Sequence, residues 1–249
     1  MTQPIRTATQ NEAMDWQTVA ARLFPEGQAI VQQGDLLIGT GRCGGQTFAV
    51  LGTADHAEIG VEVSLAMAQH VLRMVRVHPG RPLLFLMDTQ GQRLRRRDEL
   101  LGINSYMALL AKAVQVARNR GHRVLGLIYD QGLSGGILAS AMVADVCGAL
   151  PGAEIRAMNL PAMARITRIG EERLYELAQS SPVFAPGAIN YIRMGAIDSL
   201  WEGDLAQCLQ AALERADDRD HRSRQGQERG GRLLAHSIAR RVANDAYTL

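Results

Sequence analysis

Two continuous apolar runs, separated by a long amphipathic segment, constrain the fold of this chain more than any other feature. They are PLLFLMD at residues 82–88 and RVLGLIY at residues 123–129. Short runs that are apolar on both faces are typical of strands buried inside a parallel sheet. Between them, apolar residues recur at helical spacing over residues 98–121, and Gly121 stands at the expected C-terminal stop. This alternation predicts an α/β fold in which helices cover a sheet.

The N-terminal part contains a glycine pattern that resembles a nucleotide-binding motif. GTGRCG at residues 39–44 fits the letters GxGxxG, but QTFAVLGT, which follows at residues 46–53, reads as a strand. A dinucleotide site requires a helix at that point, because the helix N-terminus meets the pyrophosphate. We therefore expect a hairpin here, with its turn at Gly44 and Gly45 and its first strand at residues 35–41.

Further elements follow from periodicity and suggest three regions. We expect helices over residues 16–23, 61–78, 171–180, 186–194, 203–215 and 232–243, and short strands over residues 146–150 and 153–158. Residues 1–25 are predicted to form a tail and a short helix, and residues 26–215 the main domain. Residues 216–249 are predicted to form a charged connector and a last helix.

Composition excludes several classes of protein. The 249 residues include 27 Lys and Arg against 25 Asp and Glu, a net charge of +2, which argues against a general nucleic-acid binder. No apolar run reaches the roughly 18 residues of a membrane span, and residues 1–13 lack the apolar core of a signal peptide. The histidines and cysteines show no metal-ligand spacing. We expect a cytoplasmic protein without a metal site.

Ser134, Gly135 and Gly136 stand where the second apolar run leads into a helix of small residues. Glycine is favoured where another group approaches the backbone closely. A helix N-terminus presents unpaired N–H groups and a partial positive charge. The pattern predicts a site for a negative oxygen at the amides of Gly135, Gly136 and Ile137. The alternative is that these glycines only permit tight packing of the helix on the strand.

The same residues also spell a serine-hydrolase motif. GLSGG at residues 132–136 fits GxSxG between a strand and a helix, which would make Ser134 a nucleophile. A triad also needs an acidic residue and a histidine farther along the chain. The available histidines are His221, in the charged connector, and His236, in an amphipathic helix, and neither is well placed.

A cluster of arginines follows the first apolar run. Arg93, Arg95, Arg96 and Arg97 come directly after the strand end at MDTQG. Runs of arginine usually form a solvated face. Ligands of α/β proteins, however, gather at the carboxyl ends of the strands, so contact with a phosphate or an acidic partner is the competing interpretation.

Three segments resemble the crotonase superfamily and its carboxyltransferases. Residues 81–117 are similar to the carboxyltransferase stretch in which an apolar strand ends in Asp-Thr-Pro-Gly, with Gln90 in place of the proline. SGGILASAMVADVCGALPGAEIRAMN, from residue 134, and AINYIRMGAIDSLW, from residue 188, resemble crotonase segments. The resemblance covers roughly residues 30–215. Within the superfamily, the chain most resembles the gamma subunit of the biotin-independent malonate decarboxylases.

This resemblance implies a ββα superhelix, a beta-subunit partner and a separate alpha transferase subunit. The implied substrate is a malonyl thioester on an acyl-carrier-protein subunit that carries a coenzyme-A-derived arm, with no cofactor bound tightly by this chain. By the same resemblance, Gln90, Gly91 and Ser134 line the substrate site, and the hole at Gly135–Ile137 holds either the thioester oxygen or the carboxylate and emerging CO2. Carboxyl transfer to biotin remains an alternative, although the replacement at Gln90 matches it less well.

Overall fold

The computed structural model describes residues 14–158, 160–180, 187–193, 195–216, 224, 227–228 and 234–246. The predicted tail at residues 1–13 and most of the charged connector, with His221, lie outside these residues. No helix in the described part of the chain is both long and apolar enough to cross a bilayer.

One mixed sheet organises the described residues. Its strands are β1 (Gln28–Gln33), β2 (Leu36–Cys43), β3 (Gln46–Thr53), β4 (Ala57–Ile59), β5 (Leu83–Gln92), β6 (Val124–Leu133), β7 (Val146–Ala149), β8 (Glu154–Arg156) and β9 (Ser199–Leu200). They follow the order β1-β2-β3-β5-β6-β7-β9, with β4 paired to β5 and β8 paired to β6. The first three strands are antiparallel and the later pairs are parallel.

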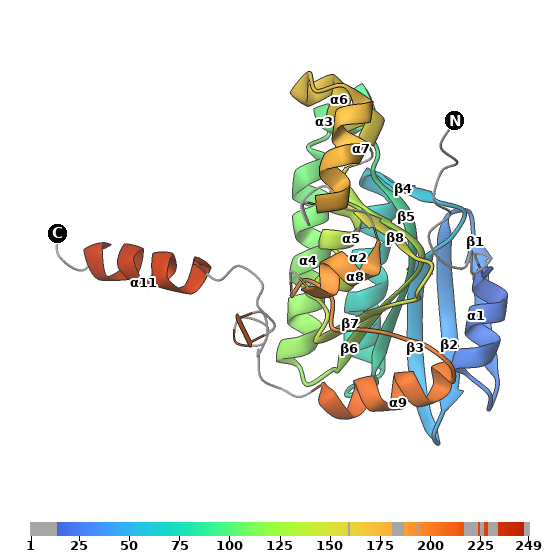
Figure 1. The fold of residues 1–249 in the computed structure, drawn as a ribbon. Helices are drawn as coiled ribbons and strands as arrows, with labels where there is room; N and C mark the ends of the chain where they lie inside the picture. The colour runs from blue at the N-terminus through green and yellow to red at the C-terminus, as the bar shows by residue number, and fades with distance from the viewer. Residues whose placement is uncertain are drawn as a thin grey trace, which may run out of the picture.

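Helices follow most of the strands. They are α1 (Trp16–Leu23), α2 (Val61–Val77), α3 (Arg96–Leu100), α4 (Ile103–Asn119), α5 (Ser134–Leu138), α6 (Leu160–Thr167), α7 (Glu171–Ser180), α8 (Ala188–Arg193), α9 (Leu205–Arg215) and α11 (Ala235–Ala246), with a 3₁₀ turn at Ala141–Val143. The predicted α/β class is confirmed (Figure 1). Strands β1 and β4 and helix α6 were not predicted.

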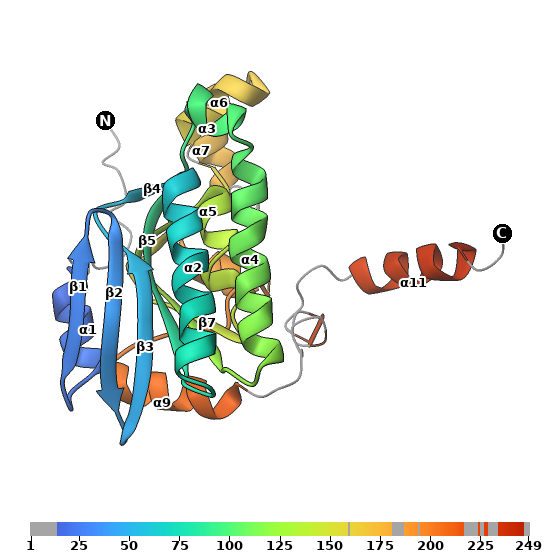
Figure 2. The same cartoon turned by 180° about the vertical axis from the view of Figure 1, so that it is seen from behind.

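The sheet has a hydrophobic core on each face. Helices α2 and α4 lie side by side on one face, and α1 and α9 lie on the other (Figures 1 and 2). Met67 of α2 and Phe85 of β5 belong to the first core, whereas Phe48 of β3 and Leu84 of β5 belong to the second. Because neighbouring residues of β5 enter opposite cores, this strand is apolar on both sides, as its sequence predicts.

The expected hairpin is present. Strands β2 and β3 pair from Leu36–Thr53 to Cys43–Gln46, with Gly44 and Gly45 in the turn at φ of +59° and +70°. Two consecutive residues at positive φ are typical of a type I′ turn, which glycine adopts without strain. GTGRCG therefore ends in a hairpin turn, and no phosphate-binding helix follows it.

Two predictions about element boundaries were wrong. Strands β5 and β6 continue past Asp88 and Tyr129 to Gln92 and Leu133, so the glycines at 135 and 136 lie inside α5 rather than in a turn before it. The long helix expected over residues 98–121 is divided into α3 and α4 at Gly102, which has a φ of +74°. A residue in the left-handed region interrupts the helical hydrogen-bond pattern.

Strands β5 and β6 each belong to two halves of the sheet. Their parallel register shifts between Met87–Ile128 and Thr89–Gly132, so three residues of β6 stand opposite one residue of β5. Beyond this shift, β4 pairs with the end of β5 and β8 with the end of β6. The irregularity places the functional residues described below at the carboxyl ends of the two central strands.

Candidate functional site

The ends of β5 and β6 meet at two small residues. A Cβ atom added to Gly91 would lie 2.6 Å from the Cβ of Ser134 and 2.9 Å from the carbonyl oxygen of Leu133. Gly91 has a φ of +103° and is buried. Only glycine fits this contact without displacing the start of α5. The structure therefore brings the predicted substrate-binding residues Gly91 and Ser134 together.

Gly136 packs against the same strands from the first turn of α5. A Cβ atom at this position would lie 2.7 Å from Cγ1 of Ile59 and 3.3 Å from Oγ1 of Thr89. Gly136 and Ile137 are buried, whereas Gly135 is partly exposed. This supports the alternative that Gly136 permits tight packing of the helix on the strand, because Ile59 already occupies the space that a side chain at position 136 would fill. The first-turn amides of α5 have no partner inside the helix, as at every helix N-terminus.

Two glutamines extend from the end of β5. The side chain of Gln92 lies beside α5, with Oε1 3.5 Å from the position of a Cβ on Gly135. Gln90 is exposed. Gln92, which the sequence analysis passed over, is thus the glutamine that borders the helix.

Ser134 has a φ of +55°, in the left-handed region that side chains rarely adopt. A serine in a constrained backbone between a strand and a helix has the local form of a hydrolase nucleophile. No histidine of the described residues hydrogen-bonds to it, and His236 is exposed on α11. The described residues therefore provide the backbone of that motif without its general base.

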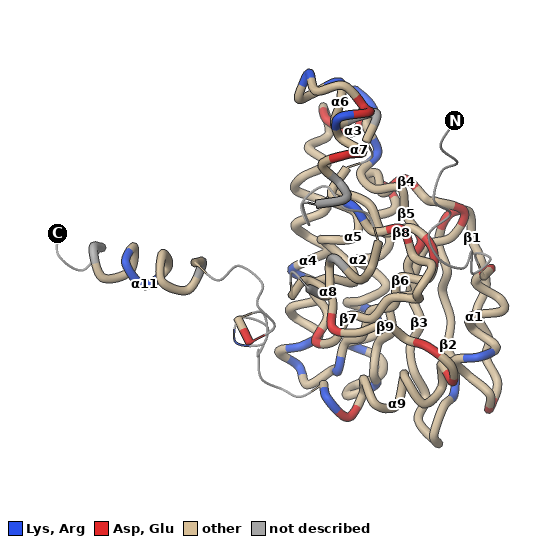
Figure 3. Tube along the Cα trace, viewed as in Figure 1, with Lys and Arg blue, Asp and Glu red and all other residues tan. Residues whose placement is uncertain are grey.

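The predicted arginine cluster separates into two kinds of residue. Arg93 has a side chain only 17% exposed and pairs with Asp35 at 3.4 Å and Glu58 at 3.3 Å, so it joins β4 to the sheet. Arg97 pairs with Glu62, and Arg95 lies 4.0 Å from Glu58, although the side chains of Arg95, Arg96 and Arg97 are all exposed. Acidic and basic residues alternate around α3 and β4 (Figure 3). The local positive charge is therefore smaller than the sequence suggests.

Three further polar residues meet where the register of β5 and β6 shifts. The carboxylate of Asp88 accepts the amide of His56 at 2.7 Å and the amide of Gln131 at 3.2 Å. Nε2 of His56 lies 2.8 Å from Asp130 and 3.8 Å from Asp88. Asp88 thereby satisfies an amide left unpaired by the irregular ladder and ties the loop before β4 to both strands.

The electrostatics of this cluster reflect its mixture of burial and charge. Burial raises the pKa of Asp88, although the amide and the charge of His56 oppose the rise. Burial lowers the pKa of His56, but the hydrogen bond to Asp130 and the charge of Asp88 outweigh it, so the net shift is upward. The cluster borders a polar cavity of about 450 Å³ beside Trp16 and Tyr129.

A metal ion is a possible occupant on geometry alone, because ligand atoms of His56, Asp88 and Asp130 lie within 4.8 Å of one another. The existing hydrogen bonds already use both carboxylate oxygens of Asp88. Sequence analysis missed this cluster. The sequence contains a signal that could have predicted it: Asp88 and Asp130 each come at the end of an apolar run. Because the carboxyl ends of adjacent parallel strands lie at the same edge of a sheet, two such aspartates are expected to lie close together.

Comparison with known proteins agrees with this architecture. The chain is 26% identical over 202 residues to the malonyl-S-ACP:biotin-protein carboxyltransferase MADD of Malonomonas rubra, covering 72% of this chain and 69% of that protein. A subunit of the Pseudomonas malonate decarboxylase hetero-tetramer, solved in complex with coenzyme A, superposes with a TM-score of 0.75 at 26% identity. That match covers 91% of this chain and 97% of the other.

The predicted carboxyltransferase-like fold is confirmed by a second structure. Transcarboxylase 12S superposes with a TM-score of 0.69 at 19% identity over 82% of this chain and 42% of that chain, a level of identity that bears on the fold alone. The sequence model of one family, the malonate decarboxylase gamma subunit, matches residues 54–246, which include β4 to β9 and the junction of β5, β6 and α5. The chain therefore belongs to the malonate decarboxylase gamma subunit family.

Proposed function

We propose that this chain is the gamma subunit of a malonate decarboxylase, in which it forms the decarboxylation site together with a beta subunit. The reaction converts a malonyl thioester on an acyl-carrier-protein subunit, with uptake of one proton, to an acetyl thioester and CO2. Membership of the gamma subunit family supports this role. The relative from Pseudomonas is a hetero-tetramer, which supports a multisubunit assembly for this chain as well.

The observation that carries the proposal is the junction of Gly91 with the first turn of α5. Loss of CO2 from a malonyl thioester leaves an enolate whose charge lies largely on the thioester oxygen. The amides of Gly135, Gly136 and Ile137 would donate hydrogen bonds to an oxygen of the substrate, and one donor of this kind contributes about 3 kcal/mol. Backbone donors suit this chemistry because they do not titrate.

The remaining substrate contacts follow from the same placement. The backbone at Gln90 and Gly91 and the hydroxyl of Ser134 would border the thioester, and exposed Arg95 and Arg96 would attract the anionic carrier. The coenzyme-A-derived arm belongs to the carrier-protein subunit, so this chain requires no tightly bound cofactor. A separate alpha subunit would transfer malonate to that arm.

A second function deserves a direct comparison, because one relative is named a biotin-protein carboxyltransferase. In that case the carboxyl group would pass to biotin on a partner protein instead of leaving directly as CO2. The Asp-Thr-Gln-Gly sequence at residues 88–91 lacks the proline of the carboxyltransferase pattern and is the feature that favours direct decarboxylation.

Co-expression of this chain with the beta, alpha and carrier-protein subunits, followed by a CO2-release assay on malonyl carrier protein, tests the proposal. We expect CO2 release that avidin does not inhibit, and inhibition by avidin would support carboxyl transfer to biotin instead.

Ser134→Ala should retain most of the CO2-releasing activity, because the proposed hydrogen-bond donors are backbone amides. An assembled, folded Ser134→Ala complex without activity, together with labelling of the unmodified chain by a fluorophosphonate, would support the hydrolase.

A further inference from the structure

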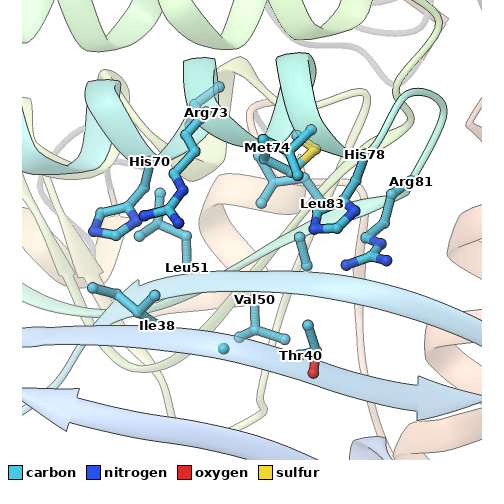
Figure 4. Close-up of a pocket in the computed structure, with 14 residues that line it drawn as sticks. Ile38, Thr40, Val50, Leu51, His70, Arg73, Met74, His78, Arg81 and Leu83 are labelled. Carbon is cyan, nitrogen blue, oxygen red and sulfur yellow. The ribbon is translucent and has the colours of Figure 1, made fainter.

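A groove lies between α2 and the uncovered side of β2 and β3, away from the proposed decarboxylation site (Figure 4). It has a volume of about 280 Å³. Leu83, at the start of β5, lies on its floor, whereas Gly91 lies near the end of the same strand. Eight residues of strand separate them by roughly 25 Å. The groove is therefore a separate feature of the fold.

The floor of the groove is apolar and reaches the hydrophobic core. Val71 is fully buried, and Leu51 and Leu83 are each 2% exposed, yet all three line the groove. Ile38 of β2 continues this floor (Figure 4), as does Ala49 of β3. The space thus lies between α2 and the apolar face of β2 and β3. An occupant has to be small, because about 280 Å³ is too little for a protein helix, which is 10–12 Å in diameter with its side chains.

The mouth of the groove is basic. Figure 4 shows His70 and Arg73 projecting from α2, and His78 and Arg81 projecting from the segment that follows it, over the apolar floor. No carboxylate lines the groove, and neither arginine has an ion pair within the described part of the chain. Burial and the charge of Arg73 lower the pKa of His70. Arg73 and Arg81 thus lie beside apolar surface without a carboxylate partner among the described residues.

We propose that this groove binds a small amphiphilic carboxylate, with its hydrocarbon chain on the apolar floor between α2 and the sheet and its carboxylate at Arg73, beside His70. The chain would remove the apolar floor from water, and the guanidinium group of Arg73 would gain charge-assisted hydrogen bonds. Arg81, at the other end of the groove in Figure 4, adds to the positive potential that attracts the carboxylate. The volume corresponds to about nine water-sized groups at about 30 Å³ each, which suits a short or medium-length chain. Malonate does not fit this description, because it is dianionic and has no apolar part.

Isothermal titration of octanoate into the full-length chain, in complex with its partner subunit, tests this assignment. We expect one site per chain, weaker binding of acetate because it lacks the chain, and no binding of octylammonium because its charge is reversed. Replacing both Arg73 and Arg81 with glutamine should weaken octanoate binding about tenfold or more. The matched control is Arg76→Gln, which removes an exposed arginine of α2 that does not line the groove.

A nuclear magnetic resonance titration locates the ligand independently of these variants. Octanoate should shift the ring signals of His70 and His78 and raise the pKa of His70, because a bound carboxylate offsets the charge of Arg73. Equal affinity for octylammonium, or an equal loss in Arg76→Gln, would refute the assignment. So would octanoate binding by the isolated chain that disappears in the complex, since a partner protein would then occupy the groove.

Discussion

At the scale of single residues, Gly136 shows that a glycine beside a proposed site can be needed because a packed neighbour leaves no room for a side chain. The sequence suggests close approach of a ligand, whereas the structure places Ile59 where a side chain would project. We expect Gly136→Ala to lower the free energy of unfolding by about 1–3 kcal/mol through overpacking. Adding Ile59→Ala should cost less than the sum of the two single changes, measured by urea denaturation. A fully stable Gly136→Ala chain whose complex with the partner subunits no longer releases CO2 would favour ligand approach.

Asp88 illustrates how one buried carboxylate joins separate segments. Asparagine has one acceptor oxygen, so Asp88→Asn would leave the amide of His56 or Gln131 facing an NH2 group. We expect a loss of about 1–3 kcal/mol in the free energy of unfolding. Glu62→Gln, at an exposed ion pair on α2, is the control and should change stability far less.

The pH dependence of Asp88→Asn gives a second measurement. Because burial raises the pKa of Asp88 in the folded state, its titration favours folding most below the unfolded pKa of about 3.9. That contribution is lost as the pH rises through the raised folded value. The stability difference between the wild-type chain and Asp88→Asn should therefore be largest in acid and narrow as the pH rises. A difference that widens with pH would contradict this assignment.

At the scale of elements, the segment from the end of β5 to α3 combines a structural arginine with exposed ones. Replacing Arg95 and Arg96 with alanine should raise the KM for the carrier-bound substrate about two- to fivefold and leave kcat nearly unchanged. The dependence of this KM on salt concentration should become weaker, because exposed charges act mainly on the rate at which the carrier protein and the enzyme meet. The paired control is Arg76→Ala with Arg120→Ala, two exposed arginines elsewhere. An unchanged KM at low salt would mean that the segment is only a solvated helix start.

Arg93 is expected to behave differently from its neighbours. Its guanidinium is largely buried and joins Asp35 and Glu58, so Arg93→Ala should destabilise the chain rather than alter KM alone. Asp35 and Glu58 are 43% and 38% exposed, so the loss comes mainly from the packing of the Arg93 side chain and from the two ion pairs that join these segments. Thermal denaturation separates this effect from the change in KM that we expect for Arg95 and Arg96.

At the scale of the whole molecule, large apolar side chains remain exposed beside the proposed site. Leu94 is 83% exposed, Leu100 76% and Leu138 58%, on the segments around α3 and α5. Exposed apolar surface near an incomplete site is typical of a subunit interface. We expect the purified single chain to be inactive and to associate with itself or aggregate, and the partner subunit to restore CO2 release. Light scattering and the CO2 assay measure both, and robust decarboxylation by the single chain would contradict the proposal.

Much of the fold could be predicted because its signals are local. The apolar runs in β5 and β6, the helical spacing in α2 and α4, and the glycines at 44 and 45 each depend on a few neighbouring residues. The sequence by itself therefore determined the α/β class and the hairpin, whereas a shared site for Gly91 and Ser134 was implied only by the family resemblance. The resemblance of longer segments led to the family that comparison then confirmed.

Only the tertiary structure decided where the strands shift register and which charges find partners. The hydrogen bonds of Asp88 to residues 32 and 43 positions away, and the ion pair of Arg93 with Asp35, depend on how β4, β5 and β6 align. Gly136, in α5, likewise needs to be glycine because of Ile59, which lies on β4. Sequence periodicity reports which face of an element is buried, but the pairing of distant polar groups depends on register and packing, which no local pattern encodes.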